Sequence, residues 1–435
     1  MSTFRNAAME EVVAEVRPVD TVGIPLGPGH PVGFLHALGE RDDWDDLTVS
    51  GALLTDLYQL FTNPQVRFLS GFFGPIERGY RDAGHRIEFV PADFRRFAPI
   101  LESLCPRVMA TAVAPPDESG WMSLSLHAGA SVDELHRAGA DPNRVLIAEA
   151  SPNFPRTLGL GPYSHRLHVD ECDFVVETDR APIALDEAEP TDVDRAIAGF
   201  ATQFIDDGST LQTGIGTIPS TIATLLAEAD GGDYGVHSEM FTSGLMLLHE
   251  AGKVTNRAKS VFEGYSITTF AAGSERLYEW LDEHDLVRFL PVDVVNSPEV
   301  IANNHNMVSI NGAMSVDLFG QVVADTITGR QFSGIGGHED FVSGSGLDLS
   351  DRSLICMPAT AMVKGVLHSR LTAELPAGAV VTTPRHQLDV LCTEFGAAEL
   401  QGKTVRERAM ALVEVAHPDF RDELAEAADS MGRMR

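Results

Sequence analysis

Short runs of β-type residues alternate with helical stretches along the chain. Such alternation is typical of parallel sheets covered by helices, because each helix carries the chain back to start the next parallel strand. We expect strands at 45–54, 143–150, 173–178 and 209–216, and helices at 94–104, 132–140 and 192–204. The pattern therefore predicts an α/β protein with mainly parallel sheets.

A domain boundary is expected shortly before residue 191. The chain has 435 residues, enough for two or three domains with a substantial core. Residues 179–192 form a polar, proline-containing stretch, and a helical pattern follows with Thr191 or Asp192 as its N-cap. We therefore expect an N-terminal α/β domain at 1–190 and a C-terminal α/β domain at 191–435.

The chain is strongly acidic. It carries 63 acidic and 32 basic residues, a formal charge of −31, and its only lysines are Lys253, Lys259, Lys364 and Lys403. Such a field repels nucleic acids and anionic membranes, so neither is expected as a partner. We interpret the charge as an acidic, soluble surface; a salt-adapted origin is the alternative.

No apolar run approaches the roughly 20 residues of a membrane span, and the first residues show no secretory signal, so a cytoplasmic protein is expected. Cys105, Cys172, Cys356 and Cys392 lack metal-type spacing and are predicted to be buried free thiols. The 15 histidines form no HExxH motif, and we predict no metal.

Two glycine-rich turns bracket a lone glutamate in the second half of the chain. They read TGIGTIPST (213–221) and SGIGGHEDF (333–341), and Glu239 lies between them in HSEMFTSG. Glycine lets backbone N–H groups approach a ligand closely, and a helix expected near Pro219 would add free donors for an anion. A carboxylate beside such donors is suited to nucleophilic attack. From these residues alone, a plain strand-to-helix turn and a solvated glutamate are the simpler interpretation.

Further blocks extend the pattern in both directions. After HSEMFTSG come AGKVTNRAK (251–259), VNSPEVIANNHNMVSINGAMSVDLFGQV (295–322) and CTEFGAAELQGKTVRERA (392–409), and the first half contains GPGHP (27–31) and IAEASPNFPRTLG (147–159). In content and order these blocks resemble the acetyl-CoA hydrolase/4-hydroxybutyrate CoA-transferase family of class I CoA-transferases. The match is close over the second half and looser over the first.

The resemblance implies two similar α/β CoA-transferase domains with the active site in the cleft between them. It implies an acyl-CoA:carboxylate CoA-transferase that works by ping-pong exchange through a glutamyl-CoA thioester on Glu239. Its substrates would be acyl-CoA and small carboxylates, such as acetate, 4-hydroxybutyrate, butyrate, propionate or succinate. No cofactor beyond CoA is implied, and we expect a homo-oligomer, specifically a dimer.

The resemblance also assigns roles to the residues of both turns and their neighbours. The expected oxyanion and CoA-binding residues are Gly214, Ile215, Gly216, Thr217, Ile218, Pro219, Ser220, Asn311, Met314, Gly336, Gly337 and Lys364. The expected acyl pocket contains Gly27, Gly29 and His30. For Asn311 and Met314 a strand with an Asx-turn is the alternative, and for Lys364 it is an ordinary exposed lysine.

A few positions depart from the family's usual residues. Ser238 replaces threonine, Ser243 replaces an acid, and Ser151 replaces asparagine. His338 and Glu339 replace small or neutral residues, and we expect a charged pair there to narrow the pocket. Two other functions stay open: acetyl-CoA hydrolysis, and a catalytically silent CoA-binding protein.

Overall fold

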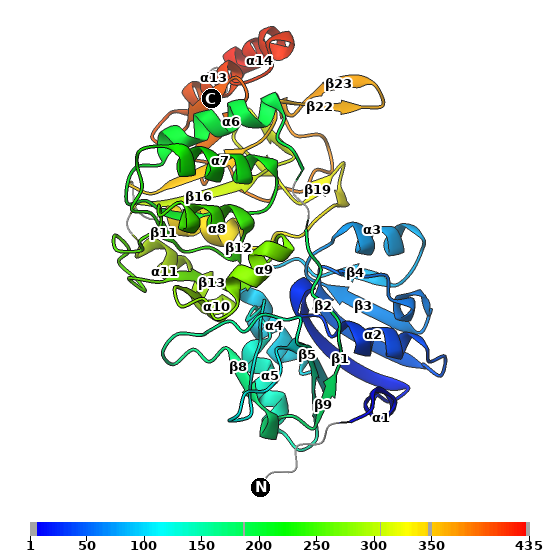
Figure 1. The fold of residues 1–435 in the computed structure, drawn as a ribbon. Helices are drawn as coiled ribbons and strands as arrows, with labels where there is room; N and C mark the ends of the chain where they lie inside the picture. Colours follow the sequence, from blue (N-terminus) through cyan, green and yellow to red (C-terminus); the bar gives the residue numbers. More distant parts are fainter. Residues whose placement is uncertain (1–6, 186–187, 305, 347–349, 432–435) are drawn as a thin grey trace. The chain divides into compact units, whose positions relative to one another are not determined.

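The chain forms two compact units in a computed structural model that describes residues 7–185, 188–304, 306–346 and 350–431 (Figure 1). Unit 1 comprises Met1–Leu185 and Ile267–Asn296, and unit 2 comprises Asp186–Ser266 and Ser297–Arg435. Unit 1 thus includes a segment from the second half of the sequence. The division into folding domains at residue 190 stays a prediction.

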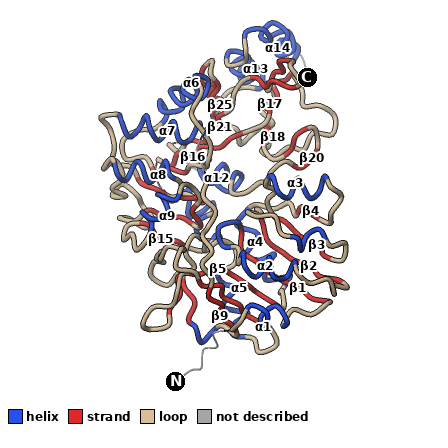
Figure 2. The backbone as a smooth tube through the Cα atoms, turned by 45° about the vertical axis from the view of Figure 1, so that its right-hand side comes forward, coloured by secondary structure: helices blue, strands red, loops and turns tan. Residues whose placement is uncertain are grey.

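Unit 1 is built on a seven-stranded parallel sheet with the order β4-β3-β2-β1-β5-β7-β9 (Figure 2). Its strands are β1 (Val19–Leu26), β2 (Asp46–Ala52), β3 (Val66–Ser70), β4 (Ile87–Phe89), β5 (Val108–Val113), β7 (Val145–Ala150) and β9 (Phe174–Glu177). Its helices include α1 (Met9–Ala14), α2 (Val32–Gly39), α3 (Pro75–Asp82), α4 (Phe97–Leu104), α5 (Val132–Ala140), α9 (Glu275–Leu281) and α10 (Val292–Val295). Shorter elements are η1 (Gly27–Gly29), η2 (Gln59–Thr62), η3 (Phe94–Arg96), η4 (Val169–Glu171), β6 (Trp121–Ser123), β8 (Arg166–His168), β13 (Ser266–Thr268), β14 (Phe270–Ala271) and β15 (Val287–Phe289).

Strand β7 shows why this sheet needs helices on both faces. All six of its residues are buried. Val145 and Ile147 belong to the apolar cluster that contains residues of α1 and α2, whereas Leu146 and Ala148 belong to the cluster that contains residues of α5. Successive side chains of a strand point to opposite faces, so a continuous apolar run is stable only when both faces are covered.

Unit 2 contains a six-stranded sheet with the order β11-β10-β16-β21-β25-β26, in which only β26 runs antiparallel. The strands are β10 (Thr210–Gln212), β11 (Gly235–Val236), β16 (Met307–Gly312), β21 (Arg352–Cys356), β25 (Val390–Thr393) and β26 (Gly396–Glu399). Its helices are α6 (Asp192–Ala201), α7 (Thr217–Glu228), α8 (Ser243–Glu250), α11 (Pro298–Ala302), α12 (His338–Ser345), α13 (Val405–Glu414) and α14 (Pro418–Met431). Short elements are η5 (Thr202–Phe204), β12 (Met240–Phe241), β17 (Ser315–Asp317), β18 (Val322–Val323), β19 (Thr326–Ile327), β20 (Arg330–Gln331), β22 (Thr360–Val363), β23 (Val366–Ser369) and β24 (Leu371–Thr372).

The predicted elements agree with these bounds where the local signals are strong. The helix expected at 132–140 has the bounds of α5, and the one expected at 192–204 is α6 followed by η5. Thr191 is the N-cap of α6, since its hydroxyl accepts a hydrogen bond from the N–H of Asp194 at 3.2 Å. The strand expected at 209–216 is shorter, because the chain leaves the sheet after Gln212.

The cysteine prediction is correct for only part of the set. All four thiols are free, but only Cys356 and Cys392 are buried. Cys105 is exposed because it follows the last residue of α4, where its φ of 45° lets the chain turn away from the helix.

Among the described residues, no helix is both long and apolar enough to cross a membrane.

Candidate functional site

The sheet of unit 2 has a switch point between β10 and β16. The chain leaves β10 through α7 to reach β11 on one side, and later leaves β16 through α12 to reach β21 on the other side. Connections that diverge from adjacent parallel strands open a crevice beyond their carboxyl ends, and this is where open α/β sheets bind ligands. The first glycine turn follows β10, and Asn311 lies near the end of β16.

Glu239 follows the edge strand β11 by three residues. Its neighbours His237 and Ser238 are completely buried, whereas Glu239 is itself only half-buried. The His237 ring stacks on Phe262, with ring centroids 6.5 Å apart and planes inclined by 7°. Because Val236, His237 and Ser238 are buried, the direction of the backbone before Glu239 is fixed. We refer to residues 236–238 as the stem of Glu239.

Ser238 joins this stem to the first glycine turn. Its Oγ accepts a hydrogen bond from the N–H of Thr213 at 3.3 Å and lies 2.8 Å from the carbonyl oxygen of Met240, to which it can donate. The serine hydroxyl therefore links the end of β10 to the residues on both sides of Glu239. Ser238 keeps the hydroxyl of the family's usual threonine, and here that hydroxyl makes these bonds.

The first turn leads into α7, a helix of 12 residues whose N-cap is Gly216. Gly216 is exposed, Ile215 is 53% exposed, and Gly214, Thr217, Ile218, Pro219 and Ser220 are half-buried. The first N–H groups of a helix have no partner within it and carry the positive end of its dipole. An anion can therefore approach the backbone of this turn.

Gln212 fixes the switch point from inside the sheet. Its side chain is buried, and its Oε1 accepts hydrogen bonds from the N–H of Ile310 at 3.1 Å and from Nδ2 of Asn311 at 3.2 Å. Gln212 could not be predicted from the sequence, because nothing in its local pattern shows a partner 98 residues away. The contact orients the amide of Asn311, one of the predicted site residues.

The second glycine turn leads into α12, and its two polar side chains bond to a threonine. His338 Nε2 lies 2.8 Å from Oγ1 of Thr383, and that hydroxyl donates to Glu339. Burial lowers the pKa of His338 to about 4, so the ring is neutral near pH 7. The expected charged pair is therefore wrong for His338, because desolvation outweighs the carboxylates nearby. Gly336 and Gly337 precede this helix, and Gly337 is its N-cap.

Met314 and Lys364 lie on different parts of unit 2. The N–H of Met314 donates to the carbonyl of Val323 at 2.7 Å, just before β17. Lys364 is exposed in the two-residue turn between β22 and β23, a hairpin that stands out from the sheet in Figure 1. Lys364 and Gly365 both have positive φ, as tight hairpin turns require.

The GPGHP loop of unit 1 also lies at a switch point. It follows β1, whose chain continues towards β2 on one side, while β5, the neighbour of β1, leads to β7 on the other. Gly29 packs on His127: a Cβ at this position would lie 2.2 Å from the imidazole Cδ2. Gly27, Gly29 and His30 are all buried, and burial lowers the pKa of His30 to about 4.

Glu149 fixes the start of α2, the helix that follows this loop. It is 3% exposed, and its carboxylate accepts hydrogen bonds from the N–H groups of Gly33 at 3.0 Å and Phe34 at 2.9 Å, in the first turn of α2. Burial raises the pKa of Glu149, while these N–H donors oppose the shift. The carboxylate thus caps the helix that begins directly after GPGHP.

Comparisons with known proteins show which family the chain belongs to. A model of the acetyl-CoA hydrolase/transferase C-terminal domain matches residues 273–428. The chain is 34% identical over 428 residues to succinyl-CoA:cyclohexane-1-carboxylate CoA transferase of Geobacter metallireducens, covering 98% of this chain and 95% of that one. It is 38% identical over 421 residues to 4-hydroxybutyrate coenzyme A transferase of Clostridium kluyveri, covering 95% of each. The crystal structure of RipA from Yersinia pestis superposes with a TM-score of 0.89 at 30% identity, covering 99% of this chain and 98% of that one.

The chain belongs to the acetyl-CoA hydrolase/transferase family. Its relatives of similar length are named CoA-transferases, and the predicted enzyme class and α/β fold class are confirmed. Membership does not by itself test the role of any residue. The site residues named above stay predictions; for those that follow β1, β10 and β16, the strand order gives an independent physical argument.

Two of the departures from the usual family residues, Ser151 and Ser243, lie in different local settings. Ser151 is buried, and its hydroxyl donates to the carbonyl of Arg180 at 2.5 Å, so it holds the following loop. Ser243 is the first residue of α8, after the N-cap Thr242. Ser151 thus bonds to the backbone of a neighbouring loop, and nothing in the structure explains the loss of the acid at Ser243.

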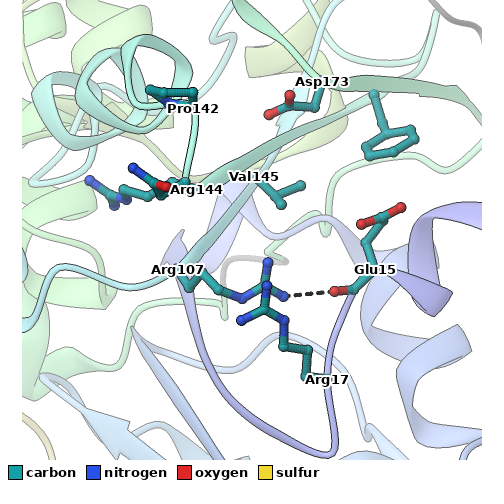
Figure 3. A pocket seen from close by; sticks show the side chains of 9 residues that line it. Glu15, Arg17, Arg107, Pro142, Arg144, Val145 and Asp173 are labelled. Atoms are coloured by element: carbon teal, nitrogen blue, oxygen red, sulfur yellow. Dashed lines mark hydrogen bonds between the residues drawn. The ribbon is translucent and has the colours of Figure 1, made fainter.

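A pocket of about 570 Å³ opens at the opposite end of the unit 1 sheet (Figure 3). Its lining residues Arg17, Arg107 and Arg144 precede β1, β5 and β7, whereas GPGHP follows β1. Arg107 is paired with Asp20, and Arg144 with Glu134 at 2.7 Å. The pocket contains none of the predicted site residues, so we do not assign the family's chemistry to it.

Metal binding has no support in the described ranges. Nowhere in them do three or more His, Cys, Asp or Glu side chains gather in a way that could hold an ion. The polar groups described above are hydroxyls, amides, imidazoles and backbone N–H groups, together with the separate carboxylates of Glu149, Glu239 and Glu339.

Proposed function

We propose that this protein is an acyl-CoA:carboxylate CoA-transferase with Glu239 as its covalent nucleophile. The observation that carries the proposal is the link between Glu239 and the first glycine turn: Ser238 bonds to the N–H of Thr213 and lies within hydrogen-bond distance of the Met240 carbonyl. Because of this link we expect the Glu239 carboxylate to lie near the N-terminus of α7, where backbone N–H groups suit an oxyanion. The names of the full-length relatives support the same reaction class.

The proposed reaction conserves the energy of the thioester. The Glu239 carboxylate attacks the acyl-CoA carbonyl, the carbon–sulfur bond breaks, and a mixed anhydride and CoA thiolate form. The thiolate attacks the glutamyl carbonyl, releasing the first carboxylate and leaving a glutamyl-CoA thioester. An incoming carboxylate then repeats both steps in reverse, so neither a nucleotide nor a metal is consumed.

The other predicted residues have supporting roles in this proposal. The turn from Gly214 to Ser220, with Asn311, Met314, Gly336 and Gly337, would contact CoA and the thioester oxygen. Gly27, Gly29 and His30 would border the acyl group. Acetate is our best single proposal for one carboxylate partner, with 4-hydroxybutyrate, butyrate, propionate or succinate as the other. We further propose a cytoplasmic homodimer.

Trapping the intermediate tests the proposal. Incubation with acetyl-CoA and no acceptor should add CoA to a peptide that contains Glu239, and borohydride should reduce that thioester and inactivate the enzyme. Glu239→Gln keeps the size of the side chain but removes the nucleophile, so exchange should fall by several orders of magnitude. CoA on Cys105 or another cysteine, with none on Glu239, would contradict the mechanism.

Glu239→Asp separates transfer from hydrolysis. The change withdraws the carboxylate by about 1.5 Å, roughly one carbon–carbon bond, and a displacement of this order can cost about a hundredfold in attack. The gap can admit water, for which the shorter acid is a general base. We expect the variant to lose transfer and gain slow acyl-CoA hydrolysis. If the parent releases CoA without an acceptor as fast as it exchanges, the enzyme is a hydrolase.

A further inference from the structure

Lys259 is buried directly behind the strand that leads to Glu239. It is only 3% exposed, and its ammonium nitrogen Nζ donates to two backbone carbonyls, that of Val236 at 2.8 Å and that of Tyr265 at 2.7 Å. Burial lowers its pKa well below the usual lysine value.

The strand it contacts has a neighbour on one side only. β11 is a two-residue strand at the edge of the six-stranded sheet, and it pairs with β10 alone. On the outer side of β11, the loop that follows α8 forms backbone hydrogen bonds with Tyr234, the residue before β11. The N–H groups of Thr255 and Asn256 both donate to the Tyr234 carbonyl at 3.0 Å. That backbone pairing ends before it reaches Val236.

At Val236, side chains instead of backbone groups make the hydrogen bonds on the outer side of the strand. Asn256, with a φ of 56°, turns the chain, and its Oδ1 accepts the N–H of Val236 at 2.9 Å. Lys259 bonds the carbonyl of the same residue. Together the two side chains satisfy both outward-facing backbone groups of a fully buried residue, as a further strand would do.

The contact bears on the last sheet-bonded peptide before Glu239. The peptide plane between Val236 and His237 is held at its oxygen by Lys259 and at its nitrogen by the Leu211 carbonyl, 3.1 Å away. The aliphatic part of the Lys259 side chain also lies against the strand, since a Cβ on Gly235 would come within 2.5 Å of Lys259 Cγ. Nearer to Glu239, the backbone is fixed by the hydrogen bond between Ser238 and Thr213.

We infer that Lys259 is a positioning residue for the nucleophile, setting the direction in which the chain leaves β11 towards Glu239. This inference rests on the proposed role of Glu239. Lys259 does not touch the reacting atoms, so its loss should slow attack by the carboxylate and leave the affinity for acyl-CoA nearly unchanged. Loss of about 1 Å in placement corresponds to roughly a hundredfold in rate.

The chain contains a matched control in Lys253. This lysine also donates to two backbone carbonyls, those of Ala229 and Gly231 just after α7, but it is only half-buried and lies at the other end of the loop that follows α8. Lys259→Met and Lys253→Met are therefore the same chemical change, removing the same number of donors. Only the first removes a bond from the stem of Glu239.

Three measurements on the full-length chain test the inference. For Lys259→Met we expect kcat of CoA exchange to fall by about ten- to a hundredfold, with KM for acetyl-CoA changed less than about threefold. Glutamyl-CoA should still form on Glu239, but more slowly. Hydrogen–deuterium exchange should rise in the peptide spanning 235–240. Lys253→Met should match the parent in all three.

Several outcomes would overturn the inference. Parent-like kcat in folded Lys259→Met would do so, as would an equal loss in both lysine variants. If Lys259→Met does not fold, Lys259→Gln, which keeps a donor, carries the same comparison. Failure of both to fold beside a folded Lys253→Met would mean that the residue serves folding instead. Absence of the adduct in the parent would contradict the proposed function itself, which separates the two failures.

Discussion

Gly29→Ala tests whether the GPGHP loop belongs to the site, because the structure predicts a definite steric conflict there. The new Cβ would lie 2.2 Å from Cδ2 and 2.5 Å from Cγ of His127. Carbon atoms in contact are about 3.5 Å apart, so loop or ring must move by roughly 1.3 Å, the difference between 3.5 and 2.2 Å. The ring has little room, since His127 is 1% exposed and its Nε2 lies 2.9 Å from Oγ1 of Thr111.

Two effects of different size follow from this displacement. Overpacking of a buried site costs about 1–3 kcal/mol of the free energy of unfolding. A loop displaced by about 1 Å beside the acyl group should lower kcat/KM for exchange by roughly a hundredfold. We therefore expect a protein that still folds but transfers CoA poorly. The assays are urea denaturation and acetate-dependent exchange from acetyl-CoA.

Gly79→Ala is the matched control in the same unit. Gly79 is exposed in α3, and its Cβ would meet no atom within 4 Å. This variant should exchange CoA at the parent rate and gain up to about 1 kcal/mol in stability from helix propensity. If Gly29→Ala is destabilised yet exchanges CoA at the parent rate, the loop does not take part in the reaction. If neither property changes, the steric argument is wrong.

Two further predictions concern Ser238 and His338. Ser238→Ala removes the hydroxyl that accepts the Thr213 N–H, so kcat of exchange should fall by about ten- to a hundredfold. Ser238→Thr keeps a hydroxyl and should retain most of the parent kcat. Equal rates in all three proteins would show that the Ser238–Thr213 bond does not matter for the reaction. Burial lowers the pKa of His338 to about 4, against about 6.5 in the unfolded chain, so the folded protein binds fewer protons and stability falls as pH falls through this window. In urea denaturation the parent should lose more stability between pH 7 and 5 than His338→Gln; parallel losses would refute the assignment.

Local signals were sufficient to predict several elements from the sequence. The bounds of α5 and the N-cap Thr191 follow from apolar periodicity and from a hydroxyl placed before an acidic first turn. Each of these features is encoded within about a dozen residues. Glu239 and the two glycine turns were instead assigned by the resemblance to the family, and their role in the site stays a prediction.

The residues that hold the site could not be predicted in this way. Glu149 caps α2 across 116 positions of sequence, and Gln212 reaches Ile310 across 98. Such pairs meet only because the strand order brings β7 and β1, or β10 and β16, to the same crevice. A glutamate in a buried strand and a glutamine at a strand end look ordinary until that order is known.

The two units solve one mechanical problem in the same way. A loop at the carboxyl end of a parallel strand must be open to a ligand on one side, so the bonds that fix it must come from its other side. In unit 1 the buried Glu149 accepts two N–H groups of α2, and in unit 2 the buried Lys259 donates to two carbonyls, one of them in β11. Each is a buried ionisable side chain bonded to backbone, a costly choice if stability were the only requirement. Glu149 makes two hydrogen bonds to one segment, and Lys259 makes two that join two segments. Because hydrogen bonds are directional, each side chain fixes the orientation of the backbone as well as its position. An apolar side chain of the same volume cannot do this.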